Sequence, residues 1–352
     1  MSESVKEKTV PTRTRAVAEI CQSSIQSGRG RGFVRWRLLL IVALPVVTLI
    51  VGLSSTSSTR LALAIATVYA IAVLSNSVVL GGLNEINLGA GGWMAVGAYA
   101  MAIFLEHSIP LLVSVVLAVA TTTLIGFVVA IPTVRLRGIF TALSTFVLAY
   151  SVPQCIVFLE SITGGSHGKS VPFGLTLFGA EIGGSSPGTL VLVTVSFIVV
   201  GLATFALLES RWGKTVIWVA EAEPAAAVFG VRTTAVKVAV WTWSAALSGL
   251  AGALFALTLG FLSPDQFQAA LGINLFVGAV IGGSRSIWAA LVGGLLIGFL
   301  PTQLQDYMPS SATGILFGGI LLVAILAGAG GLARPIEKLL ANMQTSLRRT
   351  PR

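Results

Sequence analysis

Ten apolar runs dominate this chain and constrain its fold more than any other feature. They lie at about 38–53, 61–80, 90–105, 111–131, 139–159, 188–208, 235–258, 270–283, 287–300 and 314–328. A helix needs about 20 apolar residues to cross a bilayer, so these runs are long enough to span or half-span it. Only 10% of the residues are charged, against about 25% in soluble domains. The sequence therefore predicts an all-α, polytopic membrane protein with about ten transmembrane or half-spanning helices.

The basic residues predict which side of the membrane each connection faces. Ten passes place both termini on one side, and Lys and Arg are enriched on the cytoplasmic side of membrane proteins. With the N-terminus inside, 20 of the 22 Lys and Arg residues fall on that side, and only Arg60 and Lys169 fall outside. We therefore expect both termini to be cytoplasmic. Three runs, at 90–105, 270–283 and 287–300, are short for a full span and predict broken or re-entrant helices.

This topology divides the chain into three parts. Residues 1–37 form a basic cytoplasmic tail that we expect to be disordered, 38–330 form the transmembrane domain, and 331–352 form a second basic cytoplasmic tail. Within the domain, the connection 160–187 faces outside and the connection 209–237 faces the cytoplasm. Basic tails of this kind typically fix the orientation of a membrane protein and contact anionic lipid. An RNA-binding arm would carry more aromatic residues or a motif, so we expect no nucleic-acid partner.

The stretch TGGSHGKS at 163–170 ends like a phosphate-binding loop. Such a loop reads G-x-x-x-x-G-K-[ST], follows a strand and opens a helix. Here Thr163 replaces the first glycine, the preceding residues end an apolar run, and Pro172 follows soon after. The expected topology also places the stretch outside, away from cytoplasmic nucleotide. The sequence therefore predicts a Gly/Ser-rich outer loop with an adaptable backbone, and not a nucleotide site.

Residue types that carry catalysis or bind metals are sparse. His107 and His167 are the only histidines, and Cys21 and Cys155 are the only cysteines, so neither type forms a metal-binding cluster. Of the 13 acidic residues only Glu85 lies in an apolar zone, whereas a proton-driven carrier would need several. We therefore expect no catalytic residue, no metal site and no cofactor on this chain, which leaves a channel or a permease driven by another subunit.

Two interruptions that contain glycine break the apolar pattern. LGGLNEINLG at 80–89 and IGGSRSI at 281–287 share Gly-Gly, three residues and Ile, which suggests an internal parallel repeat. Unwound backbone at membrane depth needs a cover of protein or water, and paired interruptions indicate the transport path. The alternative is that the glycines only allow close helix packing. The candidate path residues are Asn84, Glu85, Asn87, Gly89, Gly282, Gly283 and Arg285.

The inner connection 209–237 predicts a short helix from about Glu221 to Gly230. Its Glu and Ala residues favour a helix, Pro224 suits a helix start, and Gly230 resembles a stop signal. Such a helix on the cytoplasmic face would fit a groove of a partner protein. The alternative is a simple connector.

Several stretches together resemble the permeases of ABC importers for branched-chain amino acids. GKTVIWVAEAEPAAAVFGVRTTAVKVAVWTWSAALSGLAGALFALTLGFLSPDQF at 213–267 is similar to the coupling loop and following helix, and INLGAGGWMAVGAYA at 86–100 also resembles the family. RLRGIFTALSTFVLA at 135–149 and TGGSHG at 163–168 resemble the longer of two paired permeases. IGGSRSIWAALVGGLL at 281–296 is the last stretch that resembles the family, and the stretches follow one another in the family's order. The resemblance covers about 60–335, and the motifs are specific only in combination.

The resemblance implies a set of partners in the bacterial inner membrane. The chain would pair with a second, homologous permease or with itself, and it would carry no ATP hydrolysis. Two cytoplasmic ATPase subunits, with ATP and magnesium, would couple to the inner connection through Glu221, Glu223, Ala226 and Gly230. A periplasmic or lipid-anchored binding protein would deliver substrate to the outer loop at Thr163, Gly164, Gly165, His167 and Lys169.

The chain departs from the family pattern at charged positions. Glu85 stands where the family usually has Gln, Arg285 where it usually has Gly, and Ala90 where His is frequent. In the coupling loop the usual charged pattern is diluted by Ala220, Ala222 and Pro224. A lone charge at membrane depth costs about 2.5–3.5 kcal/mol on insertion scales. We therefore hypothesise that Glu85 and Arg285 pair across the path or its cytoplasmic end; the alternative is that each reaches water separately.

The expected function is translocation of branched-chain or related hydrophobic amino acids by alternating access, with ATP hydrolysed on other chains. Two alternatives stay open. One is the same fold carrying urea, short amides or a sugar, and the other is a membrane scaffold that does not transport. A self-sufficient channel or carrier is disfavoured by the resemblance of the coupling loop.

Overall fold

The computed structural model describes residues 31–172, 175–177, 179–283, 286–305 and 318–319. Most of the two expected tails and of the expected run at 314–328 lie outside these residues. The chain divides into two compact units, 1–39 and 40–352. The described part of the first unit is the beginning of helix α2, and the second unit holds the other elements.

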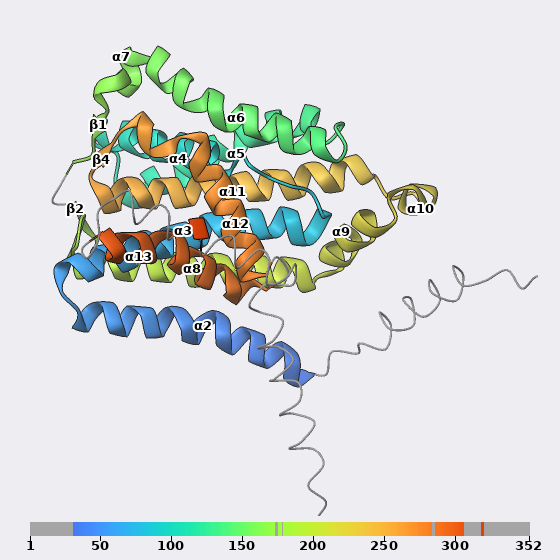
Figure 1. Cartoon of the computed structure of the whole chain (residues 1–352), viewed down its shortest axis with the longest axis horizontal. Helices are drawn as coiled ribbons and strands as arrows, with labels where there is room; N and C mark the ends of the chain where they lie inside the picture. Colours follow the sequence, from blue (N-terminus) through green and yellow to red (C-terminus); the bar gives the residue numbers. More distant parts are fainter. Residues whose placement is uncertain (1–30, 173–174, 178, 284–285, 306–317, 320–352) are drawn as a thin grey trace, which may run out of the picture. The chain divides into compact units, whose positions relative to one another are not determined.

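Helices make up most of the described chain (Figure 1). In chain order the elements are α2 (Arg31–Ser54), α3 (Ser57–Leu83), α4 (Ala90–Glu106), α5 (Leu111–Thr133), α6 (Ile139–Phe158), α7 (Glu160–Thr163), η1 (Gly165–His167), β1 (Lys169–Ser170), β2 (Leu175–Leu177), β3 (Ala180–Ile182), α8 (Pro187–Glu209), α9 (Arg211–Glu221), α10 (Glu223–Val228), α11 (Thr233–Leu259), β4 (Phe261–Leu262), η2 (Pro264–Phe267), α12 (Ala269–Gly282) and α13 (Ile287–Gln305).

The predicted polytopic all-α fold is confirmed. Among the described residues, five helices are long and apolar enough to cross a membrane, namely α3, α5, α6, α8 and α11. The three short runs form the shorter apolar helices α4, α12 and α13. Helix α2 begins at Arg31, so residues 31–37 of the expected disordered tail are helical. Phe33, Val34 and Trp36 make this stretch more apolar than the rest of the tail, which favours its joining the helix.

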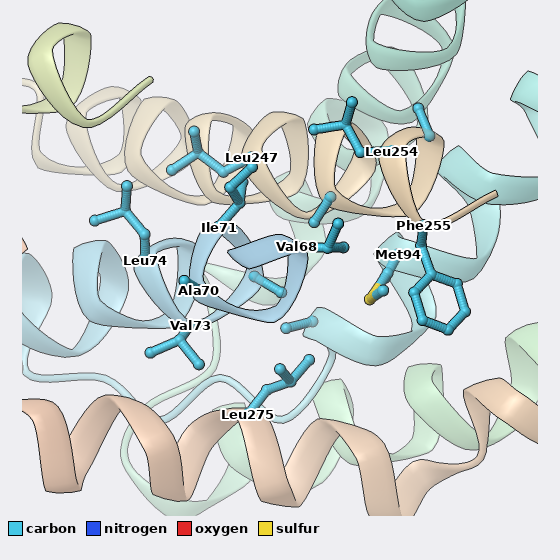
Figure 2. Packing of buried hydrophobic residues seen from close by; sticks show 14 of the residues in the cluster. Val68, Ala70, Ile71, Val73, Leu74, Met94, Leu247, Leu254, Phe255 and Leu275 are labelled. Carbon is cyan, nitrogen blue, oxygen red and sulfur yellow. The ribbon is translucent and has the colours of Figure 1, made fainter. Parts of the chain in front are cut away.

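Helices α3 and α11 lie at the centre of the second unit. Helix α3 packs against α8, α11, α12 and α13, and α11 packs against α3, α4 and α5. Figure 2 shows part of the buried core, where Ile71 of α3 lies beside Leu247 of α11 and Met94 of α4 lies near Phe255 of α11. Helices α5 and α6 expose many large apolar side chains, as helices that face lipid or a partner subunit do.

Glycines bring α4 and α11 unusually close together. A Cβ atom at Gly97 would collide with the backbone of Gly249, and one at Gly252 would collide with the carbonyl oxygen of Met94. Membrane helices gain packing contacts where small residues let their backbones approach. This close approach holds α11 against α4 and so fixes the position of the polar side chains that α11 carries.

A short antiparallel pair of strands links the predicted outer connection at 160–187 to the C-terminal end of α11. Strand β1 pairs with β4, with Lys169 opposite Leu262, and Val171 N–H donates to the carbonyl oxygen of Gly260 at 2.9 Å. A second antiparallel pair, β2 with β3, lies within the same connection. Helix α11 has 27 residues, so its N-terminal end, next to α10, and its C-terminal end, next to β4, lie about 40 Å apart at 1.5 Å per residue.

Candidate functional site

Residues 84–89 join α3 to α4 without regular secondary structure, as the sequence predicted for the first interruption. The helix does not break at the glycine pair itself, because Gly81 and Gly82 both belong to α3. The break comes at Asn84, which adopts a left-handed conformation with φ of 55°. Asparagine enters this region more readily than most residues, so Asn84 ends α3 where a continuous helix would otherwise run on.

Asn87 anchors the unwound segment in the protein interior. Its buried side-chain Nδ2 donates to Oγ of Ser244 on α11 at 3.2 Å, and its Oδ1 accepts from the N–H of Gly89 at 2.9 Å. The N–H of Leu88 donates to Oγ1 of Thr145 on α6 at 3.2 Å. Unwound backbone in a membrane protein requires such internal partners. Segment 84–89 is thus held between α6 and α11 by specific hydrogen bonds.

Glu85 takes part in a buried ion chain. Its Oε1 lies 3.3 Å from Nζ of Lys237, near the start of α11, and its Oε2 accepts from Nε1 of Trp241, one turn further along, at 2.9 Å. Nζ of Lys237 also donates to Oε2 of Glu223, the first residue of α10, at 3.0 Å. The exposed fractions of the side chains are 12% for Glu85, 10% for Lys237 and 34% for Glu223. We call these four residues, Glu85, Lys237, Glu223 and Trp241, the ion chain.

The hypothesised pair of Glu85 with Arg285 is not tested, because Arg285 lies outside the described residues. Sequence reasoning identified Glu85 but missed Lys237 and Trp241 as its partners. Lys237 entered only as one of the basic residues of the inner side. The signal was present: an acidic residue in an apolar zone requires a partner, and Lys237 and Trp241 share one helix face because they are four residues apart.

A small cavity lies next to segment 84–89. It measures about 20 Å³ and is lined by residues of α4, α5, α6 and α11, among them Thr145 and Trp241. Both of these side chains also bond to segment 84–89. A space of this size accommodates about one water molecule. This cavity between α4, α5, α6 and α11 is therefore too small for an amino acid in the described conformation.

The second interruption lies between α12 and α13. Gly282 ends α12, and a Cβ atom there would collide with the carbonyl oxygen of Ala289 on α13. Gly283 follows with φ of 105°, in the left-handed half of conformational space that favours glycine. In the first interruption, a Cβ atom at Gly82 would lie 3.3 Å from Cγ1 of Val216 on α9. Close packing thus explains Gly82 and Gly282, while a path-lining role for these regions stays a prediction.

The inner connection forms two helices where the sequence predicted one from Glu221 to Gly230. Glu221 is the last residue of α9, and Ala222 breaks the helix with φ of −147° and ψ of 64°. Helix α10 then begins at Glu223, with Pro224 in its first turn, as suits a residue without a backbone N–H. Gly230 follows α10 with φ of 83°, which agrees with the predicted stop signal. The preceding helix α9 was not predicted.

An exposed apolar patch lies on these two short helices. Its members are Ile217, Trp218, Val228 and Phe229. The rings of Trp218 and Phe229 lie with centroids 5.5 Å apart, so the two helices present one continuous surface. Val228 and Phe229 are 86% and 75% exposed. Of the predicted coupling residues, Ala226 is buried and Glu223 belongs to the ion chain, so the patch is formed by residues that sequence reasoning missed.

The stretch at 163–170 forms a tight structure that is not a phosphate-binding loop. It follows the short helix α7 and leads into strand β1, which is the reverse of the strand-to-helix order that such a loop requires. Three glycines there, Gly164, Gly165 and Gly168, have positive φ angles. Residues 164–168 also match the G-x-S-x-G pattern, but they form a 3₁₀ turn rather than the strand-to-helix elbow of a hydrolase.

Two polar residues fasten this outer loop. The hydroxyl of Thr163 donates to the carbonyl oxygen of Ile156 at 2.6 Å. Nζ of Lys169 donates to the carbonyl oxygen of Ile162 and lies 2.6 Å from Oε2 of Glu106 at the end of α4. The ammonium group stabilises the carboxylate by hydrogen bonding and by its charge, and thereby lowers the pKa of Glu106. Of the predicted outer-loop residues, Thr163 and Lys169 therefore have structural roles.

Comparison with known proteins assigns the chain to a family. The family model described as the permease component of branched-chain amino acid transport systems matches residues 58–326. The chain is 28% identical to the high-affinity branched-chain amino acid transport permease LivM of Salmonella typhimurium, over 77% of this chain and 70% of that protein. It is 30% identical to LivH of the same organism over 52% of this chain and 63% of LivH.

A more distant relative is named for the import of a different compound. The autoinducer 2 import permease LsrC of Escherichia coli is 25% identical over 54% of this chain and 56% of LsrC. The matched residues 58–326 include both interruptions, the ion chain, the paired helices α9 and α10, and the outer loop. They agree with the extent of the resemblance at about 60–335. The chain is a multi-pass membrane protein that belongs to the family of permease components of branched-chain amino acid ABC transport systems.

Proposed function

We propose that this chain moves branched-chain or related hydrophobic amino acids inward across a bacterial inner membrane, as one permease of a pair. The similarity to LivM and LivH, which are permeases of branched-chain amino acid transport systems, supports this substrate class. ATP, with magnesium, is hydrolysed by two separate ATPase subunits on the cytoplasmic side. A binding protein delivers substrate to the outer loop at 163–170, which is 27 helical residues of α11 away from the ATPase side.

The exposed patch on α9 and α10 is the single observation that carries this proposal. Helix α9 is amphipathic: it buries Gly213, Val216 and Val219 and exposes Ile217 and Trp218. The patch lies outside the five membrane-capable helices, so crossing of the bilayer does not account for its exposed aromatic and aliphatic side chains. Contiguous exposed apolar surface marks an interaction site. We assign this surface to the ATPase subunit, because the coupling loop of the family resemblance covers these residues.

Two Phe-to-Ala variants test the docking surface. Phe229 and Phe158 are both strongly exposed, at 75% and 88%, but Phe158 ends α6 next to the outer loop. The Phe229→Ala variant, alone or with Val228→Ala, should lose most of the ATPase that co-purifies with the complex. The Phe158→Ala variant should retain it. Equal ATPase retention in both variants would remove the patch from the docking surface, and absence of ATPase from the wild-type complex would refute the proposed assembly.

Uptake by the reconstituted complex tests the substrate class. The complete transporter is reconstituted in proteoliposomes, with ATP in the lumen and the cognate binding protein outside. These proteoliposomes should accumulate leucine, isoleucine or valine. Urea, short amides and sugars serve as competing substrates. Uptake of one of these in place of the amino acids would favour the alternative cargo. Failure to transport any of them, with intact ATPase binding, would favour a scaffold.

A further inference from the structure

Lys237 joins two parts of the protein that the sequence separates widely. Its Nζ contacts Glu223, which opens α10, and Glu85, which lies in the unwound segment 84–89. The three residues come from three different elements, and Trp241 closes the chain by donating to the second oxygen of Glu85. One ammonium group therefore connects the helices that carry the exposed patch with the segment that interrupts α3 and α4.

Both ends of the ion chain are attached to larger rigid parts. Glu223 belongs to α10, which buries Ala226 against the protein, and its last residue Val228 belongs to the exposed patch. Glu85 belongs to the segment that Asn87 ties to Ser244 of α11. A displacement of α10 along or away from α11 changes the Glu223–Lys237 distance. Because the same ammonium contacts Glu85, that displacement also changes the electrostatic environment of the segment.

An ion chain transmits such a displacement better than the apolar contacts nearby. The contact between Gly82 of α3 and Val216 of α9 is apolar, and apolar surfaces tolerate small slides. Lys237 and Glu85 are almost completely buried, and opposite charges interact strongly where water is largely excluded. Loss of one partner leaves an uncompensated buried charge, so the chain favours a small number of discrete arrangements. Coupling between distant sites requires an element with that property.

We propose that Lys237 is the positioning residue that couples the α9–α10 helices to the unwound segment 84–89, by holding Glu223 and Glu85 at one ammonium group. This inference rests on the proposed function, in which α9 and α10 bind the ATPase. Closure of the ATPase subunits displaces α10, the Glu223–Lys237 contact changes, and Lys237 shifts its hold on Glu85. Segment 84–89, which hydrogen bonds hold between α6 and α11 in the described conformation, then rearranges.

The Glu223→Gln variant is the sharpest test, because it leaves Lys237 paired with Glu85 and strands no buried charge. The measurement is the number of leucine molecules transported per ATP hydrolysed by the reconstituted complex. Allosteric coupling typically amounts to 5- to 150-fold, so we expect this ratio to fall by about tenfold. ATPase binding and ATP turnover should stay near the wild-type values. Glu181→Gln, the same exchange on the exposed outer strand β3, is the matched control and should keep the wild-type ratio.

A second set of variants separates coupling from stability. Lys237→Gln strands the carboxylate of Glu85 and should lower both the yield of the complex and the transport ratio. Adding Glu85→Gln removes the stranded charge, so the Glu85→Gln/Lys237→Gln double variant should recover yield but not the ratio. Lys237→Arg keeps the charge and should recover part of the ratio.

The outcomes distinguish this inference from the proposed function. If the wild-type complex neither binds ATPase nor transports amino acids, the proposed function fails. If the wild type binds ATPase and transports, and Glu223→Gln keeps the wild-type transport ratio, Lys237 is a static bridge and the inference is overturned. Recovery of the full ratio by the neutral double variant would overturn it as well, because coupling would then not need the ion chain.

Discussion

Asn87 and Ser244 lie 157 positions apart in the chain, and a hydrogen bond of 3.2 Å from Nδ2 to Oγ joins them in the protein interior. The bond fastens segment 84–89, which joins α3 to α4, to the middle of α11. Because Asn87 also accepts from the N–H of Gly89, a single side chain satisfies two groups.

Asn87→Ala should therefore destabilise the protein more than Ser244→Ala. The first change leaves the N–H of Gly89 and the hydroxyl of Ser244 without this partner, and each unsatisfied buried group costs about 1–3 kcal/mol. We expect a loss of about 2–4 kcal/mol for Asn87→Ala. Ser244→Ala leaves only Nδ2 of Asn87 without its partner, so it should cost less, about 1–3 kcal/mol. Thermal unfolding in detergent measures both, and equal losses would contradict the anchoring role.

Gly252→Ala should force α4 and α11 apart. A Cβ atom at Gly252 would collide with the carbonyl oxygen of Met94, which is backbone and cannot turn away. We expect a loss of at least the 1–3 kcal/mol that overpacking usually costs, visible as a lower unfolding temperature. Gly201→Ala on α8 is the control, because its Cβ would lie 3.2 Å from the Cγ2 methyl of Ile41, which is a tight side-chain contact and not a collision with backbone. A tolerated Gly252→Ala would mean that the helices do not approach as closely as described.

How much of this architecture the sequence could predict depends on the range of the interactions involved. The limits of α5 and α11, at Leu111–Thr133 and Thr233–Leu259, lie within two residues of the predicted runs, because hydropathy is a local property that bilayer thickness makes decisive. The unwound segment was also predicted, since its polar residues stand out in an apolar context. These features are read from neighbouring residues alone.

Partners across the fold could not be predicted in the same way. Lys237 and Glu85 meet only because close packing of α11 with α3 and α4 sets the rotation of α11, and no local pattern encodes that rotation. The glycine pair at 81–82 misled the assignment of the break, because glycine in a membrane helix serves packing as often as unwinding. The separation of α9 from α10 depends on the backbone conformation of Ala222, which alanine propensity alone argues against.

The ion pair between Glu106 and Lys169 should give the outer loop a defined pH dependence. Lys169 lowers the pKa of Glu106 below its usual range, first by hydrogen bonding and then by its charge. A carboxylate with a lowered pKa in the folded state contributes stability above its unfolded pKa of about 4.3, and that contribution disappears as pH falls through the folded pKa. The difference in unfolding temperature between wild type and Glu106→Gln should therefore be present at pH 7 and shrink as the pH falls below about 4.3.

Because Glu106 is well exposed, solvent screening keeps this difference small. Measurements at low ionic strength give the best resolution, and added salt should reduce the difference at pH 7. His107→Gln, at the next position, leaves the Glu106–Lys169 pair in place and removes only the smaller contribution that the charge of His107 makes to the lowered pKa of Glu106. An unfolding-temperature difference that persists unchanged at pH 3 would show that Glu106 acts through something other than its charge.

Gly168→Ala should detach the outer loop from the end of α11. Gly168 has φ of 79°, and a Cβ atom there would collide with the carbonyl oxygen of Leu262, opposite β1. Gly184, in the same connection, has φ of 55° but open space around its Cβ position, so Gly184→Ala carries only the left-handed penalty of about 1–2 kcal/mol. Hydrogen exchange of Val171 N–H, which bonds Gly260 at 2.9 Å, should accelerate in Gly168→Ala alone. In the proposed transporter, Gly168→Ala should also lower uptake at limiting binding protein, whereas unchanged exchange at Val171 would show that the β1–β4 pair does not depend on this glycine.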